Sequence, residues 1–293
     1  MESLTELKTI CQTTAQRDVS NVYMRYVCRP VSIRITRLLI PTAVTADQVS
    51  AVMILTGVLA AAMFLTGIPF LFYLGIALFQ LWYVLDCVDG EVARYRNFQQ
   101  SKVVTVEKTQ LPITGAYWDY LNHYIVHGLV PFAAAFGMGG GEGRGAGWVL
   151  AGFLATMGQI LLLAIHDTKS RLFLGKITRL CQSPRAVTCP QKPPPESQAR
   201  KVKKWSAAKW VFVAVHYTTT YPTVMNVLTL LAVIELVTGR PVARSLFVLY
   251  YAAASAGVFL VLAAKNLRNS GLDKEFDGTF AALEIPSGNS AAK

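Results

Sequence analysis

The chain has 293 residues, of which 53% are hydrophobic and 15% are charged, whereas about 25% are charged in an ordinary soluble domain. Too few charged residues remain to cover a soluble surface, so the composition excludes a soluble globular domain, a disordered chain and a coiled coil. A membrane-spanning helix takes about 20 apolar residues, and the chain is long enough for several. The net charge of +11 would indicate a nucleic-acid partner on a soluble protein. We expect no nucleic acid here, because in a membrane protein Lys and Arg follow the topology.

Six apolar segments predict six transmembrane helices in an all-α integral membrane protein. They run approximately over 47–66, 70–88, 115–137, 147–165, 210–238 and 241–265. Short turns and a glycine-rich stretch connect them on one side, and longer basic connections join them on the other. Of the 28 Lys and Arg residues, 25 fall on the second side, which predicts that this side and both termini are cytoplasmic. We therefore expect a multi-pass protein of the inner (plasma) membrane.

The remaining segments are expected to be cytoplasmic. The domain organisation predicted is an amphipathic arm over 1–46, a six-helix domain over 47–265 with a basic loop at 166–209, and a flexible tail over 266–293. Within the arm, Val22–Leu39 places four arginines among apolar residues. This pattern is typical of an amphipathic juxtamembrane helix, broken near Pro30, on the anionic inner leaflet. A solvated arm is the alternative.

Ionisable residues gather in the second and third predicted spans, where they are costly and therefore indicate function. Asp86 and Asp89 are three residues apart and share one helix face. Asp119, His123 and His127 are spaced by four and form one stripe. The two helices are joined on the cytoplasmic side and run antiparallel, so these groups can meet near the inner leaflet. Three converging carboxylates repel one another unless a cation lies between them, and Mg²⁺ or Mn²⁺ prefers such oxygen ligands.

A divalent ion in turn indicates a phosphate or diphosphate substrate. Next to the acids, Gly90 allows close backbone approach and Arg94 supplies a cation. His127 lies one turn deeper than His123, where a packed or hydrogen-bonded histidine is expected more than a direct role. Glu91 points elsewhere on the helix and is expected to be solvated. The polar row His216–Asn226 in the fifth segment either lines a substrate cavity or pairs between helices.

The acidic residues belong to two motifs that resemble the signature of the CDP-alcohol phosphotransferases. The first reads Asp86-x-x-Asp89-Gly90-x-x-Ala93-Arg94, and the second reads Gly115-x-x-x-Asp119-x-x-x-His123. The first matches the family pattern D-x-x-D-G-x-x-A-R at every defined position. Upstream, Val44–Ser50 is similar to the V-T-P-N-Q-V-T opening of the family's first span. The resemblance, including the six-span layout, covers roughly residues 20–265.

The resemblance implies transfer of a phosphoalcohol group from a CDP-linked donor to an acceptor hydroxyl with release of CMP, in phospholipid or related lipid biosynthesis. CDP-diacylglycerol is the expected donor, and membrane lipids surround the site. By matching position, Asp86, Asp89 and Asp119 hold the divalent metals, expected to be two ions of Mg²⁺ or Mn²⁺. The nucleotide-binding residues implied in the same way are Asp47, Ser50, Gly90, Ala93, Arg94 and Ser101. A homodimer is also implied, because relatives of this shape are often dimeric.

The chain departs from the family pattern at two places. The family's last aspartate, the general base on the acceptor hydroxyl, is His123 here. Imidazole can accept that proton but is a poorer partner for Mg²⁺ than a carboxylate. The spacer between Arg94 and Gly115 has 20 residues and is longer than in the family. Its extra stretch at 99–114 either shapes the acceptor site or is a tolerated surface insertion, and Gly115 and His127 are candidates for an acceptor or secondary site.

Two other functions stay open at this stage. One is a catalytically altered family member that binds nucleotide or lipid, because of the substitution at His123. The other is a transporter that uses the intramembrane acids as an ion relay, although the sequence contains no inverted repeat. The acceptor alcohol is not identified by any pattern in the sequence.

Overall fold

The computed structural model describes residues 2–12, 21–103, 113–138, 145–182, 206–239, 243–268 and 271–280, and these ranges contain helices and no strands. The predicted all-α class is therefore confirmed for the described part of the chain. The helices are α1 (Leu4–Cys11), η1 (Met24–Cys28), α3 (Arg29–Leu39), α4 (Ala46–Leu65), α5 (Pro69–Val103), α6 (Ile113–Met138), α7 (Ala146–Gln182), α8 (Ala207–Thr218), α9 (Thr223–Thr238), α10 (Ala243–Leu267) and α11 (Gly271–Thr279).

Among the described residues, four helices are long and apolar enough to cross a membrane, namely α4, α5, α7 and α10. The pair α8 and α9 makes a fifth if it is counted as one bent span. These helices agree with a multi-pass membrane protein. The third predicted span, α6, has 26 residues, but Asp119, Asn122 and His123 in its first half lower its mean hydropathy. Six spans and the cytoplasmic termini stay predictions.

The segment 210–238, expected to be one span, forms two helices that meet at an angle of 74°. At the end of α8, the hydroxyls of Thr219 and Thr220 donate to the carbonyl oxygens of His216 and Tyr217. The backbone N–H groups of the same two threonines also donate to these carbonyl oxygens, so α8 ends in a tight turn whose last carbonyl groups are satisfied locally. Pro222 follows at the N-cap of α9 and has no N–H to continue the first helix.

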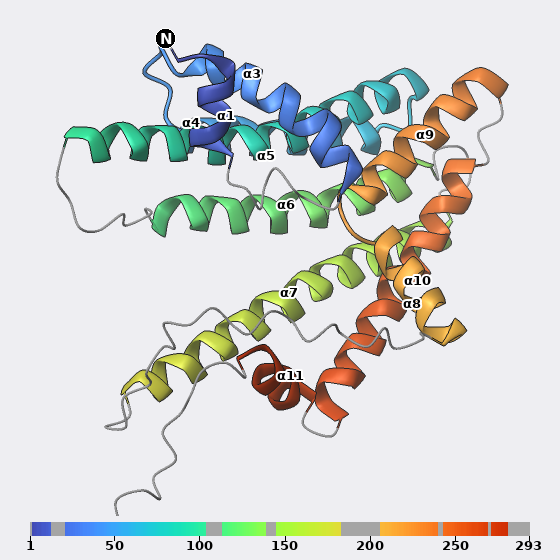
Figure 1. The fold of residues 1–293 in the computed structure, drawn as a ribbon. Helices are drawn as coiled ribbons and strands as arrows, with labels where there is room; N and C mark the ends of the chain where they lie inside the picture. Colours follow the sequence, from blue (N-terminus) through green and yellow to red (C-terminus); the bar gives the residue numbers. More distant parts are fainter. Residues whose placement is uncertain are drawn as a thin grey trace, which may run out of the picture.

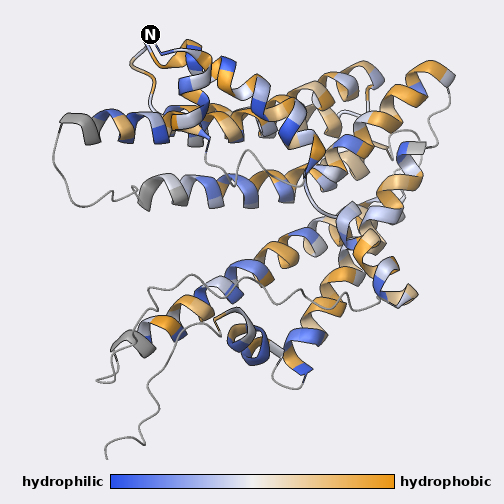
Figure 2. Ribbon diagram, in the orientation of Figure 1, coloured by the Kyte–Doolittle hydropathy of each residue, from blue (hydrophilic) through white to orange (hydrophobic). Residues whose placement is uncertain are grey.

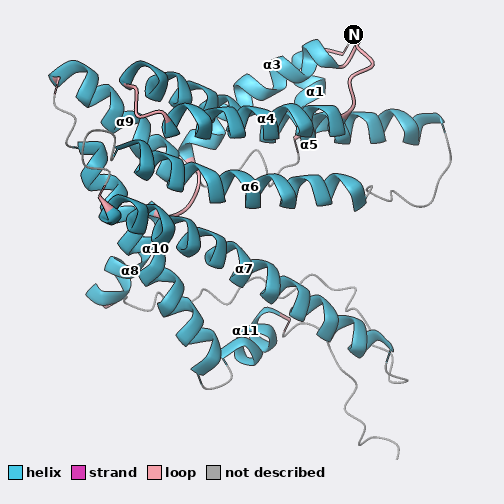
Figure 3. Cartoon of the chain, turned by 180° about the vertical axis from the view of Figure 1, so that it is seen from behind, coloured by secondary structure: helices cyan, strands magenta, loops and turns pink. Residues whose placement is uncertain are grey.

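The helices α4, α5 and α6 pack together and carry the candidate site (Figures 1 and 3). A capping box at Thr45 and Gln48 starts α4, and its two reciprocal bonds satisfy free N–H groups at the helix start. At Gly57, a Cβ would lie 2.4 Å from the side chain of Val126 on α6. Only glycine therefore permits this close approach of α4 and α6. Figure 2 shows polar residues concentrated in the C-terminal half of α5 and the N-terminal half of α6.

The amino-terminal segment is docked on α5 instead of lying free. Leu7, Cys11 and Ile33 are buried together with Tyr95 of α5. On α3, one face is buried, whereas Arg34 is exposed on the other. The predicted break near Pro30 is absent: the π-helical turn η1 passes directly into α3, and Pro30 lies in the first turn of α3, where its missing N–H costs no helical hydrogen bond. The predicted amphipathic helix is present, and its inner face contacts protein.

The helices α7 and α10 diverge from the α4–α6 layer (Figure 1). At 37 residues, α7 is about 55 Å long and extends through the first part of the expected basic loop, whereas 183–205 lies outside the described residues. The expectation of a flexible tail over 266–293 is wrong for α11, which packs against α7 through Phe276 and Phe173. Acidic residues of α11 also pair with lysines of α7, as Glu275 does with Lys169 at 2.5 Å.

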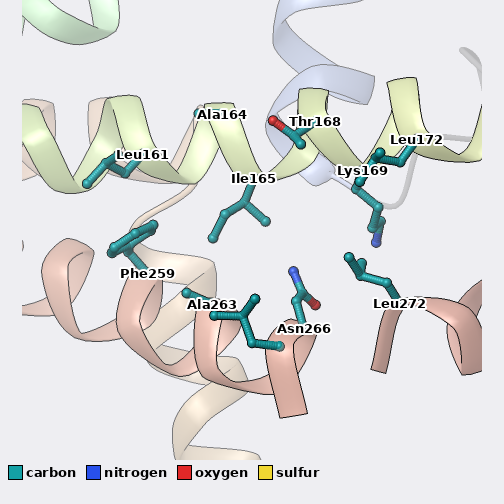
Figure 4. Close-up of a pocket in the computed structure, with 11 residues that line it drawn as sticks. Leu161, Ala164, Ile165, Thr168, Lys169, Leu172, Phe259, Ala263, Asn266 and Leu272 are labelled. Atoms are coloured by element: carbon teal, nitrogen blue, oxygen red, sulfur yellow. The ribbon is translucent and has the colours of Figure 1, made fainter. Parts of the chain in front are cut away.

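A cavity of about 260 Å³ lies between α7, α10 and α11. Figure 4 shows Ile165 of α7 facing Phe259 and Ala263 of α10, with Lys169 directed toward α11. Its walls are mostly apolar, so it offers volume and few groups for chemistry.

Candidate functional site

A cavity of about 530 Å³ lies between α3, α4, α5 and α6 and collects most of the residues that the sequence singled out. The lining residues are Arg29, Ala46, Asp47, Ser50, Asp86, Cys87, Asp89, Gly90, Ala93, Arg94, Gly115, Asp119 and His123. Arg29, Ala46 and Cys87 were not among the predicted site residues. Four carboxylates and two guanidinium groups thus line one cavity, an arrangement suited to a metal ion and an anionic ligand together.

The cavity lies near one end of the apolar part of α5. Asp86 is 17 residues beyond Pro69, where α5 begins, and this corresponds to about 26 Å along the helix axis. The hydrocarbon core of a bilayer is about 30 Å thick. If α5 crosses from Pro69, its acidic residues therefore lie close to the opposite membrane surface, where water and a charged headgroup have access.

Asp86, Asp119 and His123 form the group best arranged to hold a cation. One ligand atom from each lies within 4.8 Å of the others. His123 Nε2 is 3.8 Å from Asp86 Oδ1, and His123 Nδ1 is 3.2 Å from Asp119 Oδ1. The two carboxylates provide oxygen ligands of the kind that Mg²⁺ and Mn²⁺ prefer, and the imidazole adds a nitrogen that is a poorer ligand for Mg²⁺. The donor set therefore fits a divalent ion, and His123 takes a place in it that the sequence had given to Asp89.

The hydrogen bonding of His123 fixes which nitrogen is available. Nδ1 lies 2.9 Å from the backbone carbonyl oxygen of Asp119. A carbonyl oxygen only accepts, so we infer that Nδ1 carries the proton in the neutral ring. Nε2 then has a free lone pair, directed toward Asp86, that can bind a cation or accept a proton.

Asp89 is held by different partners. The hydroxyl of Ser50 on α4 donates to Asp89 Oδ2 at 2.9 Å, and the backbone N–H of Gly90 donates to Oδ1. Asp89 lines the cavity beside Asp86 but is not in the three-residue group. The carboxylate is thus oriented by one hydrogen bond from α4 and one from the backbone of α5, and it faces the same cavity.

Arg94 folds back over the start of its own helical turn. An added Cβ at Gly90 would lie 3.1 Å from Arg94 Nη1, so glycine at this position gives the guanidinium its room. Arg94 Nε donates to the backbone carbonyl oxygen of Cys11 in α1. Burial raises the pKa of the Cys11 thiol to about 12, so this side chain is a neutral packing group. The amino-terminal helix therefore holds a cation of the site in place.

Glu91 corrects the expectation of a solvated residue. Its side chain is fully buried, with a relative exposure of 0%. Gln12 and Ser32 donate to Oε1 at 2.7 Å each, and Thr36 donates to Oε2 at 2.8 Å. The sequence contained no signal for this, because the partners come from α3 and the residue after α1. Burial of a carboxylate requires such partners, so Glu91 fixes the amino-terminal segment on α5.

Two predicted residues, His127 and Ser101, are not among the described residues that line the cavity. His127 is 3% exposed and stacks on Tyr221 with ring centroids 3.8 Å apart, as a packed histidine does. Its two ring nitrogens have no hydrogen-bond partner among the described residues. Ser101 is in the last turn of α5, and its side chain is outside the described part of the structure. Most of the insertion, 104–112, is also outside it.

No model of a known protein family matches this chain, and no curated protein matches it. The resemblance to the CDP-alcohol phosphotransferases thus depends on the motif residues themselves.

Proposed function

We propose that the protein is a membrane transferase of the CDP-alcohol phosphotransferase type. It moves a phosphoalcohol group, most simply phosphatidyl from CDP-diacylglycerol, to an acceptor hydroxyl and releases CMP. The observation that carries the proposal is the single cavity where Asp86, Asp89, Asp119 and His123 come together with Arg94. Motif residues from α5 and α6 would not need to share a cavity if the match were accidental.

In this reaction the acceptor hydroxyl oxygen forms a bond to the phosphorus next to the alcohol of the donor. The bond from that phosphorus to the bridging oxygen breaks, and CMP leaves with the bridging oxygen. His123 Nε2 takes the hydroxyl proton, because Nδ1 already donates a hydrogen bond to the carbonyl oxygen of Asp119. Bound Mg²⁺ or Mn²⁺ would supply positive charge that stabilises the diphosphate and the leaving CMP.

Residues around the reacting groups have separate tasks in the proposal. Asp86 and Asp119 would hold a divalent ion, and Asp89 would provide a further carboxylate for a second. His123 stays free of the metal as the base, and Arg94 contacts the nucleotide phosphate. Asp47 and Ser50, at the start of α4, line the nucleotide side. The cavity opens toward the cytoplasmic leaflet of the inner (plasma) membrane, in line with the distribution of Lys and Arg.

The experiment is CMP release from CDP-diacylglycerol by the purified full chain in detergent, with Mg²⁺, Mn²⁺ or EDTA. Candidate acceptors are supplied as a pool of inositol phosphate, glycerol phosphate and serine. We expect release that requires both metal and acceptor and that is slower in Asp89→Asn. Asp273→Asn on α11 is the matched control, because this side chain is 68% exposed and far along the chain from the motifs. CMP release by Asp89→Asn at the wild-type rate contradicts the proposal.

A further inference from the structure

Arg29 is the one arginine of the juxtamembrane helices that lines the candidate cavity. Its side chain is 12% exposed, whereas Arg34 and Arg37 on the same helix are exposed. An amphipathic helix on an anionic leaflet is expected to direct its arginines outward to lipid phosphates. Arg29 instead faces α5 and the acidic residues of the cavity.

The ion pair with Glu91 fixes Arg29 but leaves much of its hydrogen-bonding capacity unused. Arg29 Nη1 is 3.5 Å from Glu91 Oε1, which is longer than the usual range for a hydrogen bond. Glu91 already accepts three shorter bonds, so it does not require this one. A guanidinium has five N–H donors, and Arg29 Nε is buried with no partner among the described residues. Such a group is poised to receive a further acceptor.

The surroundings indicate which acceptor fits. Arg29 and Arg94 are the two cations among the described residues that line the cavity. Arg94 is tied to α1 through the carbonyl oxygen of Cys11, and Arg29 is tied to α5 through Glu91. Two guanidinium groups anchored from different elements, beside a carboxylate cluster suited to a cation, are complementary to a phosphate oxyanion that also contacts metal.

We propose that Arg29 is a phosphate-binding residue of the cavity and that Glu91 is the positioning residue that holds it there. This inference rests on the proposed function in one respect, namely that a phosphate-bearing substrate occupies the cavity. It makes the amino-terminal segment a wall of the site, so that substrate binding and docking of this segment depend on the same residues.

The test measures binding to the purified full chain by calorimetry, with inorganic pyrophosphate, CDP and cytidine as probes in the presence of Mg²⁺. We expect Arg29→Gln to weaken pyrophosphate and CDP binding by about tenfold or more and to leave cytidine binding unchanged. Arg34→Gln is the matched control on the same helix and should bind all three as wild type does. Arg29→Lys keeps the charge beside Glu91 without the planar fork, so we expect intermediate affinity and a melting temperature near that of wild type.

The outcomes separate this inference from the proposed function. Wild-type affinity for pyrophosphate and CDP in a folded Arg29→Gln protein overturns the inference and leaves the transferase assignment intact. Pyrophosphate binding that depends on Arg29, without any CDP binding, supports the inference and rejects the CDP-linked donor. A lipid headgroup is the other source of phosphate. If Arg29→Gln weakens only the association with phosphatidylglycerol nanodiscs, and not pyrophosphate binding, Arg29 serves the leaflet and the inference is wrong.

Discussion

The amino-terminal bundle, comprising α1, η1 and α3–α6, and the carboxy-terminal wedge of α7, α10 and α11 both contain a cavity, yet they differ in chemistry. The bundle cavity of about 530 Å³ is lined by four carboxylates and two arginines. The wedge cavity of about 260 Å³ is lined mainly by apolar side chains, with Lys169 near its edge. A cavity between helices is thus not by itself a functional site. Of these two, only the bundle cavity brings titratable groups from several elements together.

The ion pairs of the two regions also differ, because their side chains are buried in the bundle and exposed in the wedge. In the bundle, Glu91 and Arg29 are 0% and 12% exposed, and neutral hydrogen-bond donors surround the carboxylate. In the wedge, Lys176 and Asp273 are 41% and 68% exposed. Exposed pairs contribute little to stability, whereas removing one partner of a buried pair is costly. We therefore expect substitutions in the bundle to have much larger effects than matched substitutions in the wedge.

The largest effect is expected at Asp86. Asp86→Asn removes the charge of a group that lies within 4.8 Å of Asp119 and His123 ligand atoms. We expect metal-dependent CMP release to fall by about 10²–10³-fold, the usual loss when one electrostatic contact to a transition state is removed. Steady-state rates for this variant and for Asp273→Asn would measure it. Equal losses in both variants would abolish the contrast between bundle and wedge.

The next effect concerns stability. Glu91→Ala leaves Arg29 without its charge partner and leaves the donors of Gln12, Ser32 and Thr36 unpaired, so we expect a loss of about 3–5 kcal/mol. The control is Asp277→Ala in the wedge, whose carboxylate is 3.7 Å from Lys176 and 71% exposed. Here we expect a loss below about 1 kcal/mol. Unfolding of both variants in the same detergent provides the comparison, and a Glu91→Ala protein as stable as the control would show that the buried network does not anchor α3.

A smaller, pH-dependent effect is expected at α11. The hydrogen bond from Lys169 lowers the pKa of Glu275 below its ordinary value of 4.5. Because the folded-state pKa is depressed, the stabilisation is present above pH 4.5 and is lost as the pH falls through the lower, folded-state pKa. We expect hydrogen-exchange protection of 271–280, corrected for intrinsic rates, to decrease as the medium is acidified below pH 4.5. Lys169→Gln should remove this dependence, and an unchanged acid response in that variant would assign it to other groups.

The smallest effect is expected in the wedge cavity. Ala263 lines the cavity opposite Ile165 (Figure 4), so the larger side chain of Ala263→Leu enters open space. We expect a change of about 0.5 kcal/mol or less in stability and no change in CMP release. Melting temperature and activity of the variant test this, and a loss of activity would mean that the wedge cavity takes part in the reaction.

Much of the fold was predictable because it depends on local patterns. Each of the six apolar segments falls on a helix or, for 210–238, on the pair α8 and α9. Hydrophobic runs and capping residues such as Thr45 act within a few positions of the chain, so they can be read in sequence. The bend between α8 and α9 was missed, because the polar row His216–Asn226 around Pro222 was interpreted as the lining of a cavity or as pairing between helices, inside one span.

The candidate site likewise has a part that the sequence predicted and a part that it did not. The spacing Asp86–Asp89 and Asp119–His123 places each pair on one helix face, so the sequence by itself determined that these groups converge where α5 and α6 meet. That Glu91 is buried, that Arg29 turns inward and that His127 stacks on Tyr221 was decided only by the tertiary structure. Glu91 and Arg29 are 62 residues apart. Helical periodicity gives the direction of a side chain, but which neighbouring element covers that face depends on how distant helices dock.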